Sequence, residues 1–178
     1  AGYLDDNGHL VVIDRQKDVL TTADGTRFSS AFIENKLKFS PYVEEAVTFL
    51  PTEVSGAGAA GAAGAPGMTA ILTIDPLTTG SWAEHERLSY TTYTDLAGKP
   101  EVRALLAEEV TRANEDLPES IRISRFVLLH KQFDPDDDEI TRTRKVRRNI
   151  IQDRYAAIID ALARGEDHVG ITTTVTYQ

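Results

Sequence analysis

The sequence predicts an α/β (α+β) fold in which a small sheet of about three strands is flanked by helices and preceded by β-hairpins. Segments with strand-like alternation and segments with helical periodicity follow one another along the chain. Asn-Gly and Asp-Gly pairs near the N-terminus are typical of hairpin turns. The 178 residues, 41% of them hydrophobic, suffice for one domain with a buried core.

Two hairpins are expected at the start of the chain. In YLDDNGHLVVID, Asn7-Gly8 supplies the positive φ of a tight turn between two short strands. In DVLTTADGTRFSS, Asp24-Gly25 repeats the pattern. The chain should therefore enter its main sheet only after two small antiparallel units.

A helix is expected to follow the second hairpin at AFIENKLKF. Ser29 or Ser30 offers an N-cap, and Ile33 and Leu37 share one helical face. The remaining expected elements are strands at 42–50, 68–75 and 123–131 and helices at 75–86, 100–117 and 145–164.

The sequence gives little support for a metal site, a disulfide or a catalytic triad. It has no cysteine, and its four histidines lie neither at i, i+4 spacing nor beside clustered carboxylates. The loop DPDDDE places aspartates at the first three ligand positions of a calcium-binding EF-hand. Glu139, however, replaces the required glycine, and Lys145 replaces the final glutamate. We therefore expect no metal site.

Residues 55–67, SGAGAAGAAGAPG, form a low-complexity segment. It contains a formal GxGxxG at 56–61, but a dinucleotide site needs that motif to open a helix. Here more Gly and Ala follow, with no amphipathic helix. We expect a flexible surface loop.

The segment ITRTRKVRRN, residues 140–149, carries five basic side chains in a chain of formal net charge −9. Three interpretations are open from the residues alone: a nucleic-acid patch, a solvated helix start, or a mount for one lysine that stabilises negative charge on a phosphate or carboxylate oxygen. The acidic balance and the lack of interleaved aromatics argue against nucleic acid. Composition alone favours the solvated surface.

Four motifs occur in order along the chain: the hairpin GYLDDNG, the linker DRQKD at 14–18, IENKL at 33–37 and DEITRTRKVRRNIIQDRYAAII at 138–159. Together they resemble the C-terminal domain of AMP-forming long-chain fatty acyl-CoA synthetases, in the adenylate-forming (AMP-binding) enzyme superfamily. The resemblance covers roughly residues 1–163.

The resemblance implies a mobile domain that rotates between the two half-reactions of a larger enzyme. Residues 1–18 would be the hairpin and hinge linker, residues 19–163 the C-terminal domain, and residues 164–178 a tail. A large N-terminal adenylation domain would hold the phosphate loop and the acyl pocket. Because the sequence starts with strand and turn residues rather than Met, we expect a piece of a longer chain, inactive by itself.

The implied activity is that of a cytoplasmic long-chain fatty-acid–CoA ligase. A fatty acid and ATP with Mg²⁺ give an acyl-AMP, whose acyl group then passes to coenzyme A. The resemblance implies no nucleic-acid binding and leaves room for peripheral membrane contact by the full-length enzyme. Two alternatives stay open: a non-catalytic binding module that uses residues 142–148, and an adenylating enzyme whose acceptor is not CoA.

The resemblance also implies roles for the linker and the second hairpin. Arg15 should approach the ribose hydroxyls of the nucleotide. Lys17, with Asp14 and Asp18, should form the hinge that absorbs the rotation. The turn at Gly25 should line the path of CoA in the thioester step.

Lys145 aligns with the family's adenylation lysine and is the predicted catalytic residue. It should reach the α-phosphate and the attacking carboxylate, where a permanent cation offsets the repulsion between two anions. Arg147 and Arg148 are expected mainly on the helix surface. Two residues depart from the family pattern: Asp24 stands where the turn prefers glycine, and Arg142 replaces a proline in the loop before Lys145.

Overall fold

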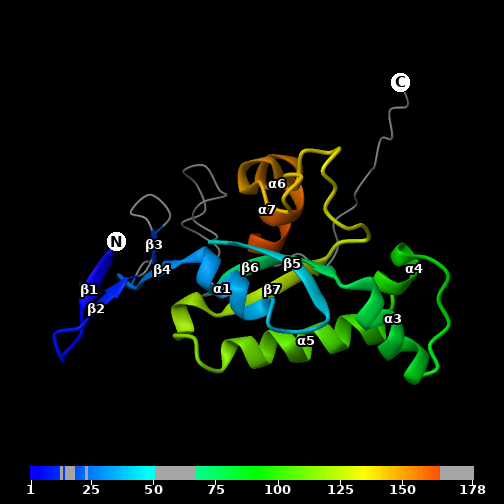
Figure 1. The fold of residues 1–178 in the computed structure, drawn as a ribbon, viewed down its shortest axis with the longest axis horizontal. Helices are drawn as coiled ribbons and strands as arrows, with labels where there is room; N and C mark the ends of the chain where they lie inside the picture. The colour runs from blue at the N-terminus through cyan, green and yellow to red at the C-terminus, as the bar shows by residue number, and fades with distance from the viewer. Residues whose placement is uncertain (13, 15–18, 23, 51–66, 165–178) are drawn as a thin grey trace.

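The computed structural model describes residues 1–12, 14, 19–22, 24–50 and 67–164. These residues form a three-stranded sheet with helices on both faces, and two hairpins extend from one end (Figure 1). The predicted fold class is confirmed. The predicted Gly/Ala loop, apart from its last glycine, and the predicted tail, apart from its first residue, lie outside the described residues.

The sheet consists of β5 (Val43–Phe49), β6 (Met68–Ile74) and β7 (Ile123–Leu128), in that order. The central strand, β6, runs antiparallel to β5 and parallel to β7. Every residue of β6 is buried. Its sequence, MTAILTI, is rich in apolar and β-branched residues, which suits a strand covered on both faces.

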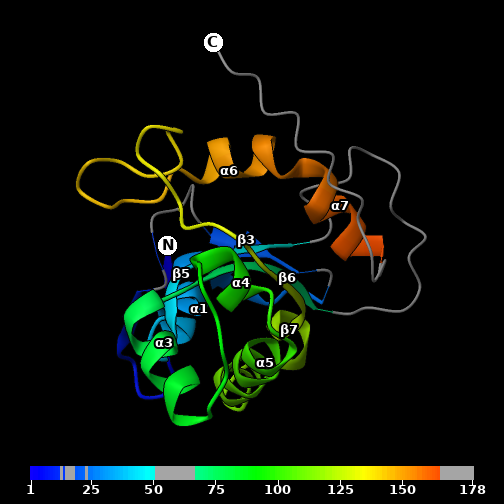
Figure 2. The same cartoon turned by 90° about the vertical axis from the view of Figure 1, so that its right-hand side faces the viewer.

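The helices of the described part are α1 (Ser30–Leu37), α3 (Pro76–His85), α4 (Tyr93–Ala97), α5 (Pro100–Asn114), α6 (Arg148–Arg154) and α7 (Ala156–Arg164), with a 3₁₀ turn at Glu119–Ile121. Figure 2 shows α1 and α5 on one side of the sheet, with α6 and α7 on the other. A hydrophobic core lies on each face of the sheet, and successive side chains of β6 enter different cores. Leu72 packs with α1 and α5, whereas Ile71 packs with α6 and α7. None of these described helices is both long and apolar enough to cross a membrane.

The N-terminal hairpins are formed by β1 (Gly2–Leu4) with β2 (Leu10–Val12), and by β3 (Val19–Thr21) with β4 (Arg27–Ser29). Both turns place glycine in the left-handed region, with φ 78° at Gly8 and 87° at Gly25. An L-residue adopts this region only with strain, so the two Gly positions set the turns. The predicted hairpin turns are confirmed.

Helix α1 begins where the sequence predicts. Ser29 occupies the N-cap position, but its hydroxyl makes no capping hydrogen bond and donates instead to the carboxylate of Asp14. Ile33 and Leu37 are buried on one face, as expected. The serine therefore ties the helix start back to the linker.

The single helix predicted at 145–164 is wrong. Residues 145–147 pair with residues 139–141 in a small hairpin, which removes them from the helix. The helical part then breaks at Tyr155 into α6 and α7. In α6, Ile151 is fully buried, whereas Ile150 is only partly buried.

Candidate functional site

The basic segment of the sequence folds as a short hairpin, residues 139–147, which we call the basic hairpin. Its base is closed by the Arg147 N–H, which donates to the Glu139 carbonyl at 2.9 Å. The next rung is an antiparallel bridge between Ile140 and Val146. Because Ile140 is buried and Val146 packs against the core beneath α6 and α7, the hairpin is fixed at its base.

The tip of the basic hairpin is a tight three-residue loop. The Arg144 N–H donates to the Thr141 carbonyl at 2.8 Å, and Arg144 has a φ of 59°. This combination is the common type I turn followed by a left-handed residue. Thr141 also bonds Lys145 twice: its N–H donates to the Lys145 carbonyl at 2.9 Å, and its hydroxyl accepts from the Lys145 N–H at 3.0 Å. The backbone of Lys145 is thereby held firmly.

The side chain of Lys145 is exposed at this tip. Within the described parts of the chain, its ammonium has no ion-pair or hydrogen-bond partner. Two neighbouring arginines differ in this respect, because Arg144 pairs with Glu44 at 3.5 Å and Arg147 with Asp138 at 2.7 Å. The hairpin thus presents one uncommitted ammonium on a rigid backbone.

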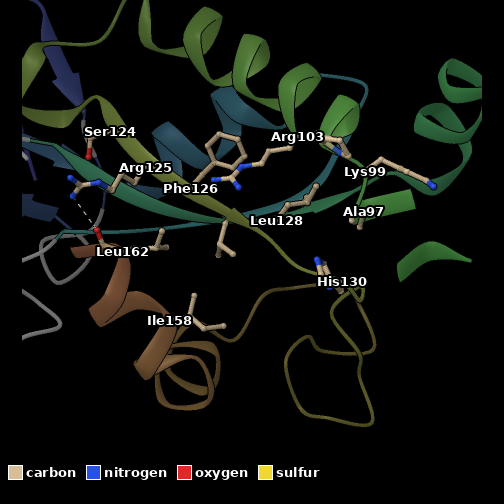
Figure 3. Close-up of a pocket in the computed structure, with 13 residues that line it drawn as sticks. Ala97, Lys99, Arg103, Ser124, Arg125, Phe126, Leu128, His130, Ile158 and Leu162 are labelled. Carbon is tan, nitrogen blue, oxygen red and sulfur yellow. Dashed lines mark hydrogen bonds between the residues drawn. The ribbon is translucent and has the colours of Figure 1, made fainter. Parts of the chain in front are cut away.

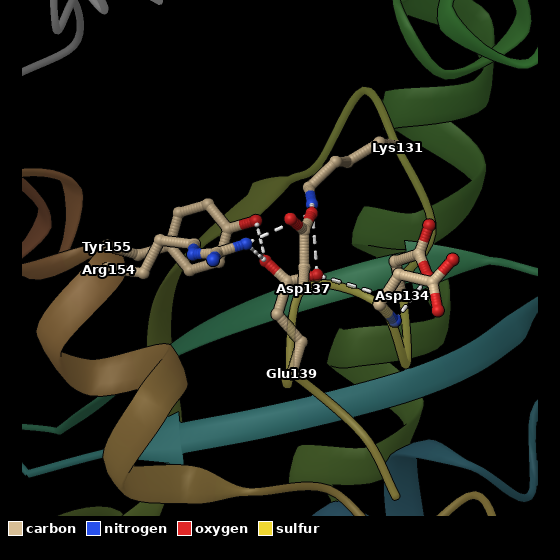
Figure 4. Close-up of polar contacts among 7 residues, drawn as sticks. Lys131, Asp134, Asp137, Glu139, Arg154 and Tyr155 are labelled. Carbon is tan, nitrogen blue, oxygen red and sulfur yellow. Dashed lines mark hydrogen bonds and ion pairs between the residues drawn. The ribbon is translucent and has the colours of Figure 1, made fainter. Parts of the chain in front are cut away.

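Glu139, at the base of the basic hairpin, is a fully buried carboxylate. Figure 4 shows donors converging on it from neighbouring segments. Its Oε1 accepts from the Tyr155 hydroxyl at 2.7 Å and from the Arg154 guanidinium at 3.1 Å. Its Oε2 accepts from the Lys131 ammonium and the Asp134 N–H, both at 3.0 Å. Each oxygen has two donors, which offset the large cost of burying a charge.

Asp137 completes this cluster, accepting from Lys131 at 2.5 Å and pairing with Arg154 at 3.0 Å. The hydrogen bond from Lys131 lowers the pKa of Asp137. Burial opposes the charged amine of Lys131, but hydrogen bonds to Asp137 and Glu139 raise its pKa. Burial, with the bond to Glu139, raises the pKa of Tyr155 well above its usual range. Tyr155 therefore remains a hydroxyl donor at neutral pH.

The residues of this cluster were not predicted as functional. Glu139 stood out in the sequence only as a misfit to a calcium loop. Its neighbours in the acidic run also carry carboxylates, and its donors lie up to 16 residues away in the chain. Burial is the distinguishing property, and it depends on the whole fold.

Arg148, the first residue of α6, connects the basic hairpin to the opposite side of the sheet. Its guanidinium donates to the Glu34 carboxylate of α1 and to the Thr48 carbonyl of β5. It also lies 5.7 Å from the centre of the Phe49 ring. The predicted place of Arg148 on the helix surface is therefore wrong: it bridges three elements.

Glu34, the partner of Arg148, is itself mostly buried, with 17% of its side chain exposed. It also accepts from the Thr48 N–H at 2.8 Å. Burial raises the pKa of Glu34 even though Arg148 and Thr48 act in the opposite direction. The carboxylate therefore depends on these two partners to remain charged.

The turn at Gly25 lies in the second N-terminal hairpin, on a different side of the molecule from the basic hairpin (Figure 1). The Asp24 carboxylate accepts from the Thr22 hydroxyl and from the Thr26 N–H, the latter at 3.0 Å. These hydrogen bonds, with Thr22 contributing most, lower the pKa of Asp24. Asp24 thus serves to shape the turn in place of the glycine expected there.

Of the four residues predicted to act in the linker, the structure describes one, Asp14. Asp14 lies against the first hairpin, where its N–H donates to the Ala1 carbonyl at 3.4 Å, and its carboxylate accepts from Ser29. Arg15, Lys17 and Asp18 lie outside the described residues. Their assigned roles at the nucleotide and the hinge remain predictions.

A groove of about 520 Å³ runs along the edge strand β7, between the N-terminus of α5 and α7 (Figure 3). Its lining includes Lys99, Arg103 and Arg125. Arg125 donates to the Leu162 carbonyl at 3.2 Å, and Lys99 pairs with Asp95 at 3.0 Å. Two of these cations are engaged within the protein, and no predicted site residue lines the groove. The basic hairpin is the better candidate site.

No family model matches the chain. Over 164 residues, the chain is 34% identical to a protein of Mycobacterium tuberculosis named as a fatty-acid–CoA ligase, fadD11. Over 166 residues, it is 28% identical to the long-chain-fatty-acid–CoA ligase FadD15 of the same species. These matches include 92% and 93% of the chain but 26% of each relative. The chain thus spans about a quarter of the length of these relatives and corresponds to their C-terminal part.

Two solved adenylation domains share the fold. The domain from a carboxylate reductase of Mycobacterium chelonae matches with a TM-score of 0.62 at 17% identity, over 87% of this chain and 21% of that one. The domain from a carboxylic acid reductase of Segniliparus rugosus, solved with AMP and a co-purified carboxylic acid, matches with a TM-score of 0.60 over the same shares at 17% identity. The chain is thus similar in sequence to the C-terminal part of proteins named as fatty-acid–CoA ligases, and it shares its fold with solved adenylation domains.

Proposed function

We propose that this chain serves a long-chain fatty-acid–CoA ligase, which activates a fatty acid with ATP and then forms acyl-CoA. The observation that carries the proposal is the Lys145 ammonium, exposed at a rigid hairpin tip and uncommitted within the described parts of the chain. The relationship to proteins named as fatty-acid–CoA ligases supports the reaction class.

In the first half-reaction, a carboxylate oxygen of the fatty acid attacks the α-phosphorus of ATP. The bond from that phosphorus to the bridging oxygen breaks, and pyrophosphate leaves. Both reactants are anionic, so the Lys145 ammonium would reduce their repulsion and stabilise the charge of the pentacoordinate transition state. A compact ammonium on a flexible stem suits this contact better than a planar guanidinium.

In the second half-reaction, the thiol of coenzyme A displaces AMP from the acyl-AMP. We assign the turn at Gly25 to this step and Lys145 to the first. The two lie on different sides of the domain (Figure 1), so rotation about the linker would bring them to one nucleotide in turn. Lys17, with Asp14 and Asp18, would form the hinge, and Arg15 would contact the ribose.

The N-terminal adenylation domain of the longer protein is the proposed partner, and the chain alone is expected to be inactive. It spans 26% of the length of its relatives. Within the described part, no group of three or more His, Asp or Glu side chains could hold a metal ion. Mg²⁺ would therefore be bound with ATP outside this part of the protein.

The test is Lys145→Ala in the full-length protein. We expect fatty-acid-dependent pyrophosphate exchange to fall about 100-fold or more, the usual effect of removing one transition-state charge contact. Thioester formation from supplied acyl-AMP should stay near the wild-type rate. Arg142→Ala, an exposed neighbour in the same loop, is the control and should affect neither step. Equal loss of both half-reactions would contradict the role of Lys145.

The alternative of a binding module on residues 142–148 is disfavoured by the geometry. Arg144, Arg147 and Arg148 are each paired with a carboxylate of the same chain. An electrophoretic mobility shift with RNA or DNA at low salt would revive this alternative. A non-CoA acceptor would appear as acyl-AMP consumption that coenzyme A does not accelerate.

A further inference from the structure

The buried carboxylate of Glu139 and the exposed ammonium of Lys145 stand at opposite ends of the basic hairpin. The Glu139 carbonyl accepts from the Arg147 N–H at 2.9 Å and so closes the base. Beyond the bridge between Ile140 and Val146, the Thr141 hydroxyl accepts a hydrogen bond from the Lys145 N–H. A shift of the Glu139 backbone would therefore be passed on to the backbone of Lys145, because hydrogen bonds join the two strands from base to tip.

The basic hairpin has few other attachments that could fix its direction. Residues 142–145 are all exposed. Arg144 and Arg147 make ion pairs with residues outside the hairpin, but these pairs are exposed to solvent and contribute little to stability. Of the apolar residues of the hairpin, Ile140 belongs to the hydrophobic core and Val146 packs against it. Apolar contacts fix how deeply the hairpin is inserted better than they fix the direction in which its tip points. We therefore assign the orientation of the hairpin to the hydrogen bonds of Glu139, which are directional.

The donors to Glu139 come from two separate parts of the fold. Lys131 and Asp134 lie in the segment that follows β7, whereas Arg154 and Tyr155 lie at the junction of α6 and α7 (Figure 4). The break in the helical segment falls at Tyr155, whose hydroxyl reaches Oε1 at 2.7 Å. The Glu139 carboxylate thus links the basic hairpin both to the segment that follows the sheet and to the helical layer of α6 and α7.

We propose that Glu139 is a positioning residue for Lys145, with Tyr155 as its principal neutral donor. This inference rests on the proposed role of Lys145 in adenylate formation. The buried carboxylate would set the place from which the ammonium meets the α-phosphate. A displacement of about 1 Å at a reacting centre can cost on the order of 100-fold in rate, so a loosened hairpin should be measurable.

The main variant is Glu139→Gln in the full-length protein, which preserves side-chain volume and removes the charge. We expect kcat of adenylate formation to fall about 10- to 100-fold. KM for ATP and for the fatty acid should change less than about 3-fold, because the lost interaction acts in the transition state. Thioester formation from supplied acyl-AMP should be unchanged, which a general loss of folded protein would not allow.

A kinetic double-mutant cycle separates positioning from destabilisation. If Glu139 acts through Lys145, Glu139→Gln should slow adenylate formation in the wild type and have almost no further effect in Lys145→Ala. Multiplicative losses in the double variant would overturn the proposal. If Lys145→Ala alone leaves adenylate formation intact, the proposed function fails and the cycle reports that separately.

Two further variants guard against misfolding as the explanation. Tyr155→Phe keeps the ring and removes one donor, so it should give a smaller loss in the same half-reaction and faster hydrogen exchange of the Arg147 amide. Asp137→Asn is the matched control: it shares Lys131 and Arg154 with Glu139 but closes no rung of the hairpin. A loss in Asp137→Asn equal to that in Glu139→Gln would overturn the proposal.

Discussion

Arg148 shows how one side chain can join layers that lie on opposite faces of the sheet. Its guanidinium contacts Glu34 of α1 and the carbonyl of Thr48, while its backbone begins α6. Glu34 is buried enough for its pKa to rise, so it relies on this cation to stay ionised. A pair of this kind is costly to break from one side, because the remaining charge is left buried.

We therefore predict that Arg148→Ala lowers the free energy of unfolding by about 1–3 kcal/mol, less than for a fully buried pair because 37% of the Arg148 side chain is exposed. Arg147→Ala is the matched control. Its pair with Asp138 is largely exposed and should contribute no more than about 1 kcal/mol. Urea unfolding at pH 7 measures both. Equal effects of the two substitutions would show that Glu34 finds another partner when Arg148 is removed.

At the scale of elements, α4 is fastened to the end of β6 by Tyr93. The Ile74 N–H donates to the Tyr93 hydroxyl at 3.2 Å. Burial, aided by the nearby charge of Glu44, raises the pKa of Tyr93 to about 12. The folded state therefore favours the protonated hydroxyl, and its contribution to stability is complete below pH 10 and is lost as pH rises toward 12.

Tyr93→Phe should accordingly be less stable than the wild type at pH 8, by on the order of 1 kcal/mol for the orphaned Ile74 N–H. That difference should shrink between pH 10 and pH 12, because the wild type alone loses the tyrosine contribution. Thermal unfolding across this range, with the exposed Tyr3→Phe as control, measures it. A constant difference would mean that Tyr93 titrates like a tyrosine in water.

The elements that the sequence predicted well depend on local signals. The three sheet strands, α1, α5 and the glycine turns follow from alternation, helical spacing and backbone preference, all of which act over a few residues. The prediction of one helix over 145–164 was wrong. The helical spacing of apolar residues continues from Val146 to Leu162, but contacts with residues distant in the sequence interrupt the helix itself. Pairing with Glu139 removes the first turn, and the break at Tyr155 follows from its position opposite the same carboxylate.

The candidate site was predictable to a similar degree. Lys145 could be singled out because the motifs around it occur in the family's order. The buried carboxylate at the base of its hairpin could not be predicted, since Glu139 is held by donors from two separate parts of the fold. Similarly, nothing in the residue types of KVRR distinguishes Arg147, which stays at the surface, from Arg148, which crosses to α1.

At the scale of the whole molecule, the two surfaces to which we propose functions belong to one domain. The basic hairpin lies next to α6 and α7, whereas the hairpin of β3 and β4, which carries the turn at Gly25, extends from one end of the molecule (Figure 1). A rigid three-stranded core with helices on both faces can carry them as one body. We expect this arrangement in a domain that rotates as a rigid body relative to its partner and keeps its own shape.

The first hairpin is the surface that we predict to contact the proposed partner domain. Leu4 and Leu10 are cross-strand neighbours and are 67% and 69% exposed, so they place two large apolar groups side by side at the surface, where we predict an interface. Replacing both by serine should change the unfolding free energy of this chain by less than about 0.5 kcal/mol, since both are exposed. In the full-length protein, the same change should lower the melting temperature and hasten proteolysis next to the hairpin. Leu77→Ser, which removes an isolated leucine that is 83% exposed, is the control. Identical behaviour of the two variants in the full-length protein would rule out burial of the hairpin against the partner domain.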